Sequence, residues 1–172
     1  KDKNNNWIYP DDVFSKDGKN YFLNNNPTEK VIVGPSESMS KSKKNTIDPE
    51  KIIKMYGADA VRLFILSDSP PEKDIQWSDT GISASYKFLQ KLWSLNEKIT
   101  NNRTKSSKFD NELEKFTNQI IKKLGDDLDR FGLNVTIASV HKIHSFFNQH
   151  TNKEDWGSNF HKNYVNILKA IN

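Results

Sequence analysis

The chain has 172 residues, a hydrophobic fraction of 34% and a formal net charge of +4. It contains no cysteine, which excludes disulfide scaffolds and thiolate metal sites, and no apolar run approaches the roughly 18 residues of a membrane span. The low hydrophobic fraction favours two small modules over a self-contained enzyme. The basic charge favours a polyanionic partner, and we expect a cytoplasmic protein.

Residues 1–35 combine short apolar runs with turn residues. The runs lie at residues 7–9, 21–23 and 31–33, and a Lys-Asp-Gly-Lys turn at 16–19 separates the first two. Apolar runs between Gly, Pro and Asn predict β-strands. We expect these strands to form a small sheet.

A Ser/Lys-rich segment at residues 36–48 is expected to be a loop that leads into helices. Asp48-Pro49 combines a side-chain cap with a proline at the first helical position, so a helix is expected from Pro49 to about Tyr56. A second helix is expected after Gly57. Its inward residues should be Ala60, Val61, Phe64 and Ile65.

Apolar residues then recur at helical spacing to the end of the sequence, which predicts an antiparallel helical bundle. Its first helix is expected over residues 80–100, with Ser78 or Asp79 as N-cap. The inward residues are expected to be Ile82, Tyr86, Leu89, Trp93 and Ile99, then Leu113, Phe116, Ile120, Leu124 and Leu128, then Leu133, Ile137, Val140 and Phe147, then Phe160, Tyr164, Leu168 and Ile171. Because large aromatics are normally buried, core anchors rather than base-stacking platforms are expected at Trp77, Phe88, Trp93 and Phe131.

The segment with the clearest chemistry reads Ser38-Met39-Ser40-Lys41-Ser42-Lys43-Lys44-Asn45-Thr46-Ile47-Asp48-Pro49. Small residues let backbone N–H groups approach a phosphate, hydroxyls donate hydrogen bonds, and a lysine supplies a movable positive charge. A solvated Ser/Lys linker is the alternative explanation of the same composition.

This segment resembles the Lys-Met-Ser-Lys-Ser signature of the class I aminoacyl-tRNA synthetases, including the downstream Asn45 and the helix start at Asp48-Pro49. Residues 56–64 resemble the segment that follows the loop in several of these enzymes. Residues 69–93, and later 131–138, are similar to the leucyl enzyme specifically. The similarity spans roughly residues 36–145, with one departure: Ser38 stands where the family has its first lysine. Lys43 or Lys44 could substitute for that lysine if the loop shifts, but their spacing also fits ordinary exposed positions, which is the favoured interpretation.

The resemblance implies a leucine–tRNA ligase parent of bacterial type, which attaches leucine to tRNA(Leu) through a leucyl-adenylate. It implies ATP as substrate, with Mg²⁺ expected on the ATP, no protein-bound metal, no membrane partner, and a monomeric parent. The ATP-binding signature loop would consist of Ser38, Met39, Ser40, Lys41 and Ser42. Lys41 is the catalytic candidate, because adenylate formation builds negative charge on phosphate oxygens.

The implied fold is mainly α, in three parts. Residues 1–35 form a β segment at the edge of the catalytic and leucine-specific region, residues 36–79 form the signature loop and stem-contact helices, and residues 80–172 form an incomplete anticodon-binding-type bundle. We expect a C-terminal piece of the enzyme, inactive by itself because the nucleotide-binding sheet and the leucine pocket are absent from it.

Five basic residues are candidates for contact with tRNA phosphates, and a solubilising surface explains them equally well. They are Lys87, Lys91, Lys98, Arg103 and Lys105. His141 and His144 share a helical face, but no cysteine or nearby carboxylate completes a metal site. A solvated helix face accounts for Asp126, Asp127 and Asp129.

Two other functions remain open. One is a different class I synthetase, such as the isoleucyl or methionyl enzyme, which is disfavoured by Pro70-Pro71-Glu72 together with Trp77-Ser78-Asp79. The other is a non-catalytic helical RNA-binding or assembly module whose Ser/Lys loop is coincidental.

Overall fold

The computed structural model describes residues 1–101, 108–152 and 156–171. By its internal contacts the chain divides into two compact units, Lys1–Lys54 and Met55–Asn172. The first is called the loop unit below, and the second the helical unit.

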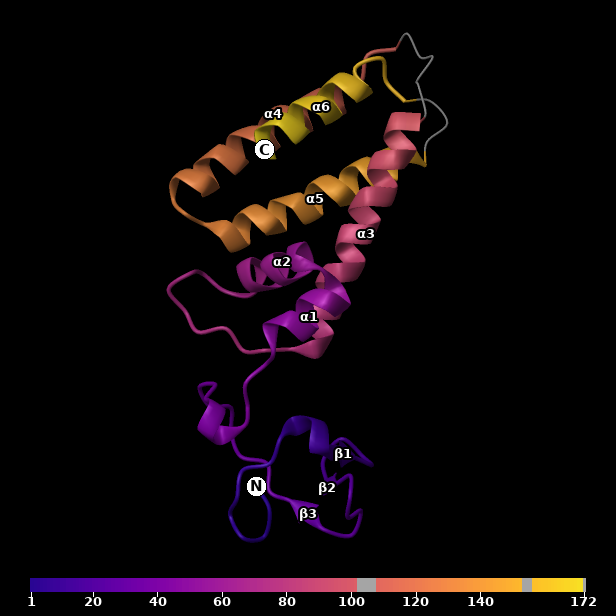
Figure 1. Ribbon diagram of the computed structural model, residues 1–172. Helices are drawn as coiled ribbons and strands as arrows, with labels where there is room; N and C mark the ends of the chain where they lie inside the picture. The colour runs from indigo at the N-terminus through magenta and orange to yellow at the C-terminus, as the bar shows by residue number, and fades with distance from the viewer. Residues whose placement is uncertain (102–107, 153–155, 172) are drawn as a thin grey trace. The chain divides into compact units, whose positions relative to one another are not determined.

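The loop unit contains a three-stranded antiparallel sheet in the order β1-β2-β3 (Figure 1). Its strands are β1 (Val13–Ser15), β2 (Tyr21–Leu23) and β3 (Lys30–Val31), preceded by a 3-10 turn, η1 (Pro10–Asp12). The register pairs Phe14 with Phe22. The predicted small sheet and its strand at 21–23 are therefore confirmed.

The other two predicted strands are placed differently in the structure. Residues 7–9 are outside the sheet, because Pro10 opens the turn η1 and the strand begins only after it, at Val13. Trp7 lies instead under the Lys1 ammonium, 4.4 Å from Nζ to the ring centroid. The strand predicted at 31–33 is shorter and begins at Lys30, and Ile32 and Val33 are exposed.

Six α-helices follow within the described ranges. They are α1 (Pro49–Tyr56), α2 (Ala58–Asp68), α3 (Asp79–Asn101), α4 (Asn111–Asp129), α5 (Leu133–Thr151) and α6 (Phe160–Ile171). The division between the two units falls within α1. None of the helices in the described ranges is long and apolar enough to cross a bilayer.

The predicted helix starts are confirmed by their side-chain caps. The Asp48 carboxylate accepts the Glu50 amide at 3.0 Å ahead of α1, and the Ser78 hydroxyl accepts the Gly81 amide at 3.1 Å ahead of α3. Each cap satisfies a backbone donor that the first helical turn leaves without a partner.

The core of the helical unit lies where α4 packs against α5 and α6, and α5 also contacts α2 and α3 (Figure 1). The buried cluster consists of Leu95, Ile99, Leu113, Ile120, Leu124, Ile143, Phe147, Trp156, Phe160, Tyr164 and Ile167. Phe147 is fully buried, and its ring lies edge-on to Phe160 at 5.3 Å and tilted against Tyr164 at 5.2 Å between centroids. The predicted bundle, with seven of its expected core residues, is confirmed by this cluster.

Two of the four predicted aromatic anchors are wrong. Phe88 is buried and Trp77 is half-buried, edge-on to Phe64, but Trp93 and Phe131 are each 67% exposed. Trp93 remains at the surface of α3 and donates its ring N–H to Glu97 at 3.0 Å. Phe131 occupies a left-handed conformation with φ 56° in the turn between α4 and α5, where its side chain is exposed.

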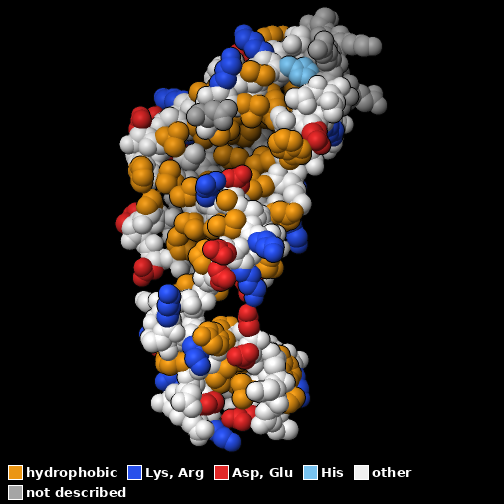
Figure 2. Space-filling model, viewed as in Figure 1, with side chains coloured by type: hydrophobic (Ala, Val, Ile, Leu, Met, Phe, Trp, Pro, Cys, Tyr) orange, Lys and Arg blue, Asp and Glu red, His pale blue; other side chains and the backbone are white. Residues whose placement is uncertain are grey.

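Several residues that were predicted to face the core are exposed instead. α3 buries Ile82, Ser85, Phe88, Leu95 and Ile99. The exposed members of the predicted inward set are Ile65, Tyr86, Trp93, Leu128, Leu168 and Ile171. The predicted face of α3 was therefore rotated, because the positions of α2 and α5 decide which side of the helix is covered. Hydrophobic side chains accordingly remain on the visible surface of the helical unit (Figure 2).

Candidate functional site

The signature loop contains a short turn with Lys41 at its first position. Ser40 is extended, and the 3-10 turn η2 (Lys41–Lys43) follows it. The Lys43 amide donates to the Ser40 carbonyl at 3.1 Å, and the Lys44 amide donates to the Lys41 carbonyl at 3.2 Å. The five residues predicted to form the ATP loop therefore lead into, and partly form, one hydrogen-bonded turn.

Asn45 fastens this turn at its base. Its side-chain oxygen accepts the Ser40 amide at 2.7 Å, and its side-chain nitrogen donates to the Ser38 carbonyl at 3.3 Å. The hydroxyls of Ser40 and Ser42 lie 2.8 Å apart within the turn. One amide side chain thus joins the two ends of the loop, which limits the conformations open to Lys41.

The three lysines of the loop have different surroundings. The Lys41 side chain is exposed, and no carboxylate among the described residues lies within ion-pair distance of it. Lys43 forms an ion pair with Glu37, which lowers the pKa of that carboxyl through the hydrogen bond and the opposite charge. The Lys44 ammonium lies 5.1 Å from the centroid of the Tyr9 ring. Lys43 and Lys44 are half-buried, so the prediction that they are ordinary exposed positions is wrong.

Further contacts hold the loop from outside its signature. Lys51 on α1 pairs with Asp11 at 2.9 Å, and this contact raises the pKa of the lysine. Glu37, Tyr9 and Asp11 were not found from the sequence. Glu37 reaches Lys43 across a turn, and Tyr9 and Asp11 are distant in sequence from their lysine partners, so no helical or strand pattern indicated these contacts.

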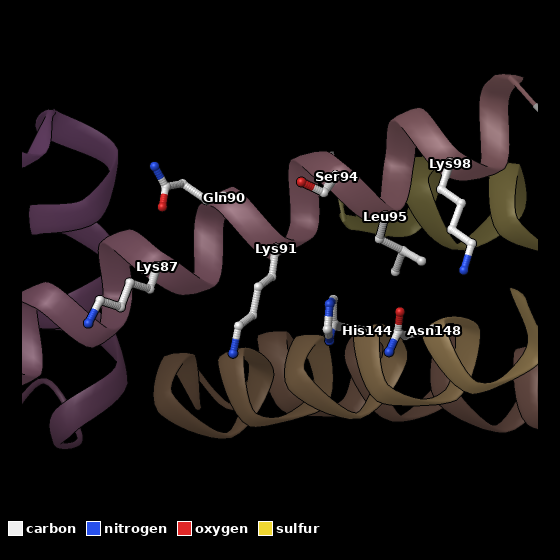
Figure 3. Close-up of a pocket in the computed structure, with 8 residues that line it drawn as sticks. All are labelled: Lys87, Gln90, Lys91, Ser94, Leu95, Lys98, His144 and Asn148. Atoms are coloured by element: carbon white, nitrogen blue, oxygen red, sulfur yellow. The ribbon is translucent and has the colours of Figure 1, made fainter. Parts of the chain in front are cut away.

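Three of the predicted tRNA-contacting lysines lie together along α3. Lys87, Lys91 and Lys98 line a groove of about 580 Å³ that α3 forms with His144 and Asn148 of α5. The side chains of Lys91 and Lys98 point from α3 toward α5 (Figure 3). Lys98 also donates to the Asn152 side chain at 2.9 Å. Arg103 and Lys105 lie outside the described residues.

The two histidines of α5 contact an aromatic ring rather than a metal-ligand set. The His141 ring stacks on Phe88 at 3.7 Å between centroids, and the His144 ring lies edge-on to the same phenyl ring at 5.6 Å. Burial lowers the pKa of both histidines. A neighbouring basic group lowers each pKa further: His144 acts on His141, and Lys91 acts on His144. Within the described part of the chain, no three His, Cys, Asp or Glu side chains are arranged to hold a metal ion.

The acidic residues at the end of α4 are only partly solvated. Asp126 and Asp129 are exposed, as expected of a wet helix face. Asp127 pairs with Lys123 at 2.6 Å, one helical turn earlier.

Known proteins share both the loop and the helices around it. Residues 30–78 match the family model of the tRNA synthetases class I (I, L, M and V), a range that includes η2, α1 and α2. By sequence, the loop and the two helices that follow it are therefore those of a class I tRNA synthetase.

The similarity to one amino-acid specificity extends over almost the whole sequence. The chain is 40% identical over 171 residues to the leucine–tRNA ligase of Rickettsia bellii, covering 98% of this chain and 20% of that protein. It is 44% identical over 144 residues to the leucine–tRNA ligase of Rickettsia prowazekii, covering 83% of this chain and 17% of that protein. By sequence, the chain belongs to the leucine–tRNA ligase family, and it spans about a fifth of the length of these relatives.

A solved structure of the same family has a similar fold. It is the LeuRS of the Agrobacterium radiobacter K84 agnB2 LeuRS-tRNA-LeuAMS ternary complex, with a TM-score of 0.64 and 21% sequence identity. The match covers 77% of this chain and 18% of the solved one. The arrangement of elements in this chain is therefore one that a leucyl enzyme adopts.

Proposed function

We propose that this chain is part of a leucine–tRNA ligase and supplies the loop that closes over ATP. The observation that carries the proposal is Lys41, an exposed lysine without a carboxylate partner among the described residues, on a turn fastened by Asn45. The identity to leucine–tRNA ligases continues through this loop and into the helices. A solvated linker would need neither the fastened turn nor this identity.

The reaction determines what such a lysine can do. A carboxylate oxygen of leucine attacks the α-phosphorus of ATP, a new P–O bond forms, and pyrophosphate leaves with the electrons of the broken bond. Negative charge grows on the phosphoryl oxygens and the leaving group, and a cation already in place stabilises it. Lys41 can provide that cation, whereas Lys43 is engaged with Glu37. Mg²⁺ is expected on the ATP rather than on residues of this chain.

The basic groove between α3 and α5 is proposed to contact tRNA. Its three lysines face one concave surface, which suits the repeated charges of a nucleic-acid backbone. The solved relative with this fold was captured in a complex with tRNA. Contacts of this kind would position the tRNA body without reading its sequence.

The catalytic proposal is tested in a full-length ligase that carries this sequence. Lys41→Ala should slow leucyl-adenylate formation by roughly 10²–10³-fold, because one preorganised phosphate-stabilising charge is worth about 3–4 kcal/mol in the transition state. Leucine affinity should change far less, since the charge acts mainly on the transition state. Single-turnover kinetics with a folding check on each variant separates the two quantities.

Two variants of the same loop serve as controls. Lys43→Ala should slow adenylation by no more than about fivefold, because Lys43 is paired with Glu37 rather than available to the phosphates, and an ion pair at the protein surface contributes little. Ser38→Lys restores the usual first lysine of the family and should leave the rate unchanged or raise it. A near-normal adenylation rate in Lys41→Ala, or a loss confined to tRNA binding, would show that Lys41 has another role.

The tRNA proposal is tested on the chain itself. It should bind tRNA weakly, with an affinity that falls steeply as salt concentration rises, because binding releases counterions from the phosphates. Lys87→Gln with Lys91→Gln should reduce both the affinity and its salt dependence. Absence of binding at low salt, or binding indifferent to salt, would contradict this assignment of the groove.

A further inference from the structure

A second hollow lies on α3, beside the basic groove. It has a volume of about 300 Å³ and is lined by the end of α1, the start of α2 and one face of α3. Three aromatic residues, Tyr56, Tyr86 and Trp93, contribute to its surface, so this hollow is called the aromatic pocket. The rings of Tyr56 and Tyr86 meet edge to face at 6.0 Å between centroids.

The aromatic pocket is open to solvent, and its largest ring, that of Trp93, is not packed into the core. Trp93 is 67% exposed and Tyr86 is 38% exposed. The hydrogen bond from the Trp93 ring nitrogen to Glu97 keeps the indole on the surface of α3 in one orientation. An oriented, exposed indole is a surface on which a planar ligand can stack.

Helical geometry places the aromatic pocket and the lysines along the two edges of the exposed side of α3. Tyr86 and Trp93 are seven residues apart on one edge, and at about 100° per residue Lys87 and Lys91 lie roughly 100–160° around the helix from them. Gln90 lines both hollows. In Figure 3 its side chain points away from α5, while that of Lys91 points toward α5. The two hollows therefore border the same exposed side of α3, with Gln90 between them.

We infer that α3 binds a strand of RNA at an unpaired nucleotide, with the base stacked on Trp93 in the aromatic pocket and phosphates further along the strand, across the exposed side of α3, against Lys87 and Lys91. This inference rests on the proposed tRNA partner and adds the kind of nucleotide that is recognised. Aromatic rings beside a basic groove are the combination that single-stranded nucleic acid requires, because every base offers a face for stacking.

Carboxylates in and beside the aromatic pocket determine which part of a nucleotide suits it. Asp59 lines the aromatic pocket and is paired with Arg62 at 2.8 Å, while Glu97 is bound to Trp93. These carboxylates disfavour a phosphate there and leave the uncharged base as the suitable occupant. An apolar helix from a protein partner would fill the aromatic pocket but would leave Lys87 and Lys91 without counter-charges.

Fluorescence anisotropy with three probes tests the inference on the chain itself. The probes are a labelled oligouridylate of about ten nucleotides, an abasic ribose-phosphate oligomer of the same length, and a blunt RNA duplex. The oligouridylate should bind more tightly than the abasic oligomer. Trp93→Ala should weaken oligouridylate binding by about five- to tenfold and leave the abasic oligomer and the duplex unaffected, whereas Trp93→Phe should retain most of the affinity.

Phe131→Ala is the matched control, because Phe131 is as exposed as Trp93 and lies outside the aromatic pocket. It should leave all three affinities unchanged, and Lys91→Gln should weaken all three. If Trp93→Ala binds oligouridylate like the unaltered chain while Lys91→Gln weakens it, the stacking inference is overturned and the tRNA proposal stands. If the unaltered chain binds none of the probes at low salt, both fail.

Discussion

The loop unit and the helical unit are stabilised by different interactions. Among residues 1–54, all of which the structure describes, Val31 is the one buried hydrophobic side chain. Short-range polar contacts supply much of the order there, such as the Asp17 carboxylate with the amides of Lys19 and Asn20. The helical unit instead has a continuous core drawn from four helices.

This difference matches the proposed roles of the two units. A loop that closes over a substrate must change conformation at small cost, and such loops belong to the less stable parts of proteins. A groove that positions a large nucleic acid benefits from helices held by a packed core. We therefore predict that substitutions in the core and substitutions in the loop unit each affect the stability of their own unit.

The largest effect is expected at the centre of the core. Phe147→Ala removes a fully buried ring that contacts Phe160 and Tyr164, which should lower the free energy of unfolding of the helical unit by about 3–5 kcal/mol. Val31→Ala is the counterpart in the loop unit and should cost only about 1–2 kcal/mol, because it removes two methyl groups. Amide hydrogen exchange followed peptide by peptide reports on each unit. Equal loss of protection in both units after either substitution would show that they unfold together.

A smaller effect is expected from the polar clamp between α4 and α6. The buried Asn163 side chain donates to the Glu114 carboxylate at 2.8 Å and to the Asn159 carbonyl at 2.9 Å. Asn163→Ala leaves these acceptors with fewer donors and should cost about 1–3 kcal/mol, measured by urea denaturation. Asn118→Ala, at an exposed position of α4, is the control and should be neutral or slightly stabilising. Equal stability of the two variants would mean that the clamp contributes nothing.

The sequence predicted those features that depend on neighbouring residues alone. The starts of α1 and α3 follow from caps that act within a turn, at Asp48 and Ser78. The signature loop was predicted because the residues that define it are consecutive in the sequence. Features that depend on distant packing were not predictable in the same way.

Three errors illustrate that limit. Trp93 was assigned to the core because aromatic residues are usually buried, yet the contacts of α2 and α5 select another face of α3. The ion pair of Lys43 with Glu37 and the contact of Lys44 with Tyr9 are tertiary contacts within the loop unit. They decide which lysine remains available to a ligand, and no periodicity in the sequence records them.

The smallest expected effect is a difference in acid sensitivity between the two units. In the loop unit, backbone hydrogen bonds from Asn20 and Lys19 lower the pKa of Asp17 from its ordinary value of 3.8 to about 2. In the helical unit, hydrogen bonds from Asn163 and Asn159 lower the pKa of Glu114 below its ordinary value of 4.5. A carboxyl whose pKa is lower in the folded state stabilises that state above its unfolded pKa, and the stabilisation is lost as pH falls through the folded value.

The turn at Asp17 should therefore persist as pH is lowered through about 4 and loosen only toward pH 2. The clamp at Glu114 should begin to weaken once pH falls below 4.5. Carboxyl chemical shifts in an NMR titration give both pKa values directly, and Asp17→Asn and Glu114→Gln should each remove the pH dependence at their own site. An Asp17 carboxyl that titrates near 3.8 would mean that its hydrogen bonds do not persist in solution. The loop unit would then lack one of the polar contacts that substitute for a core, and the signature loop would be attached to a less ordered base.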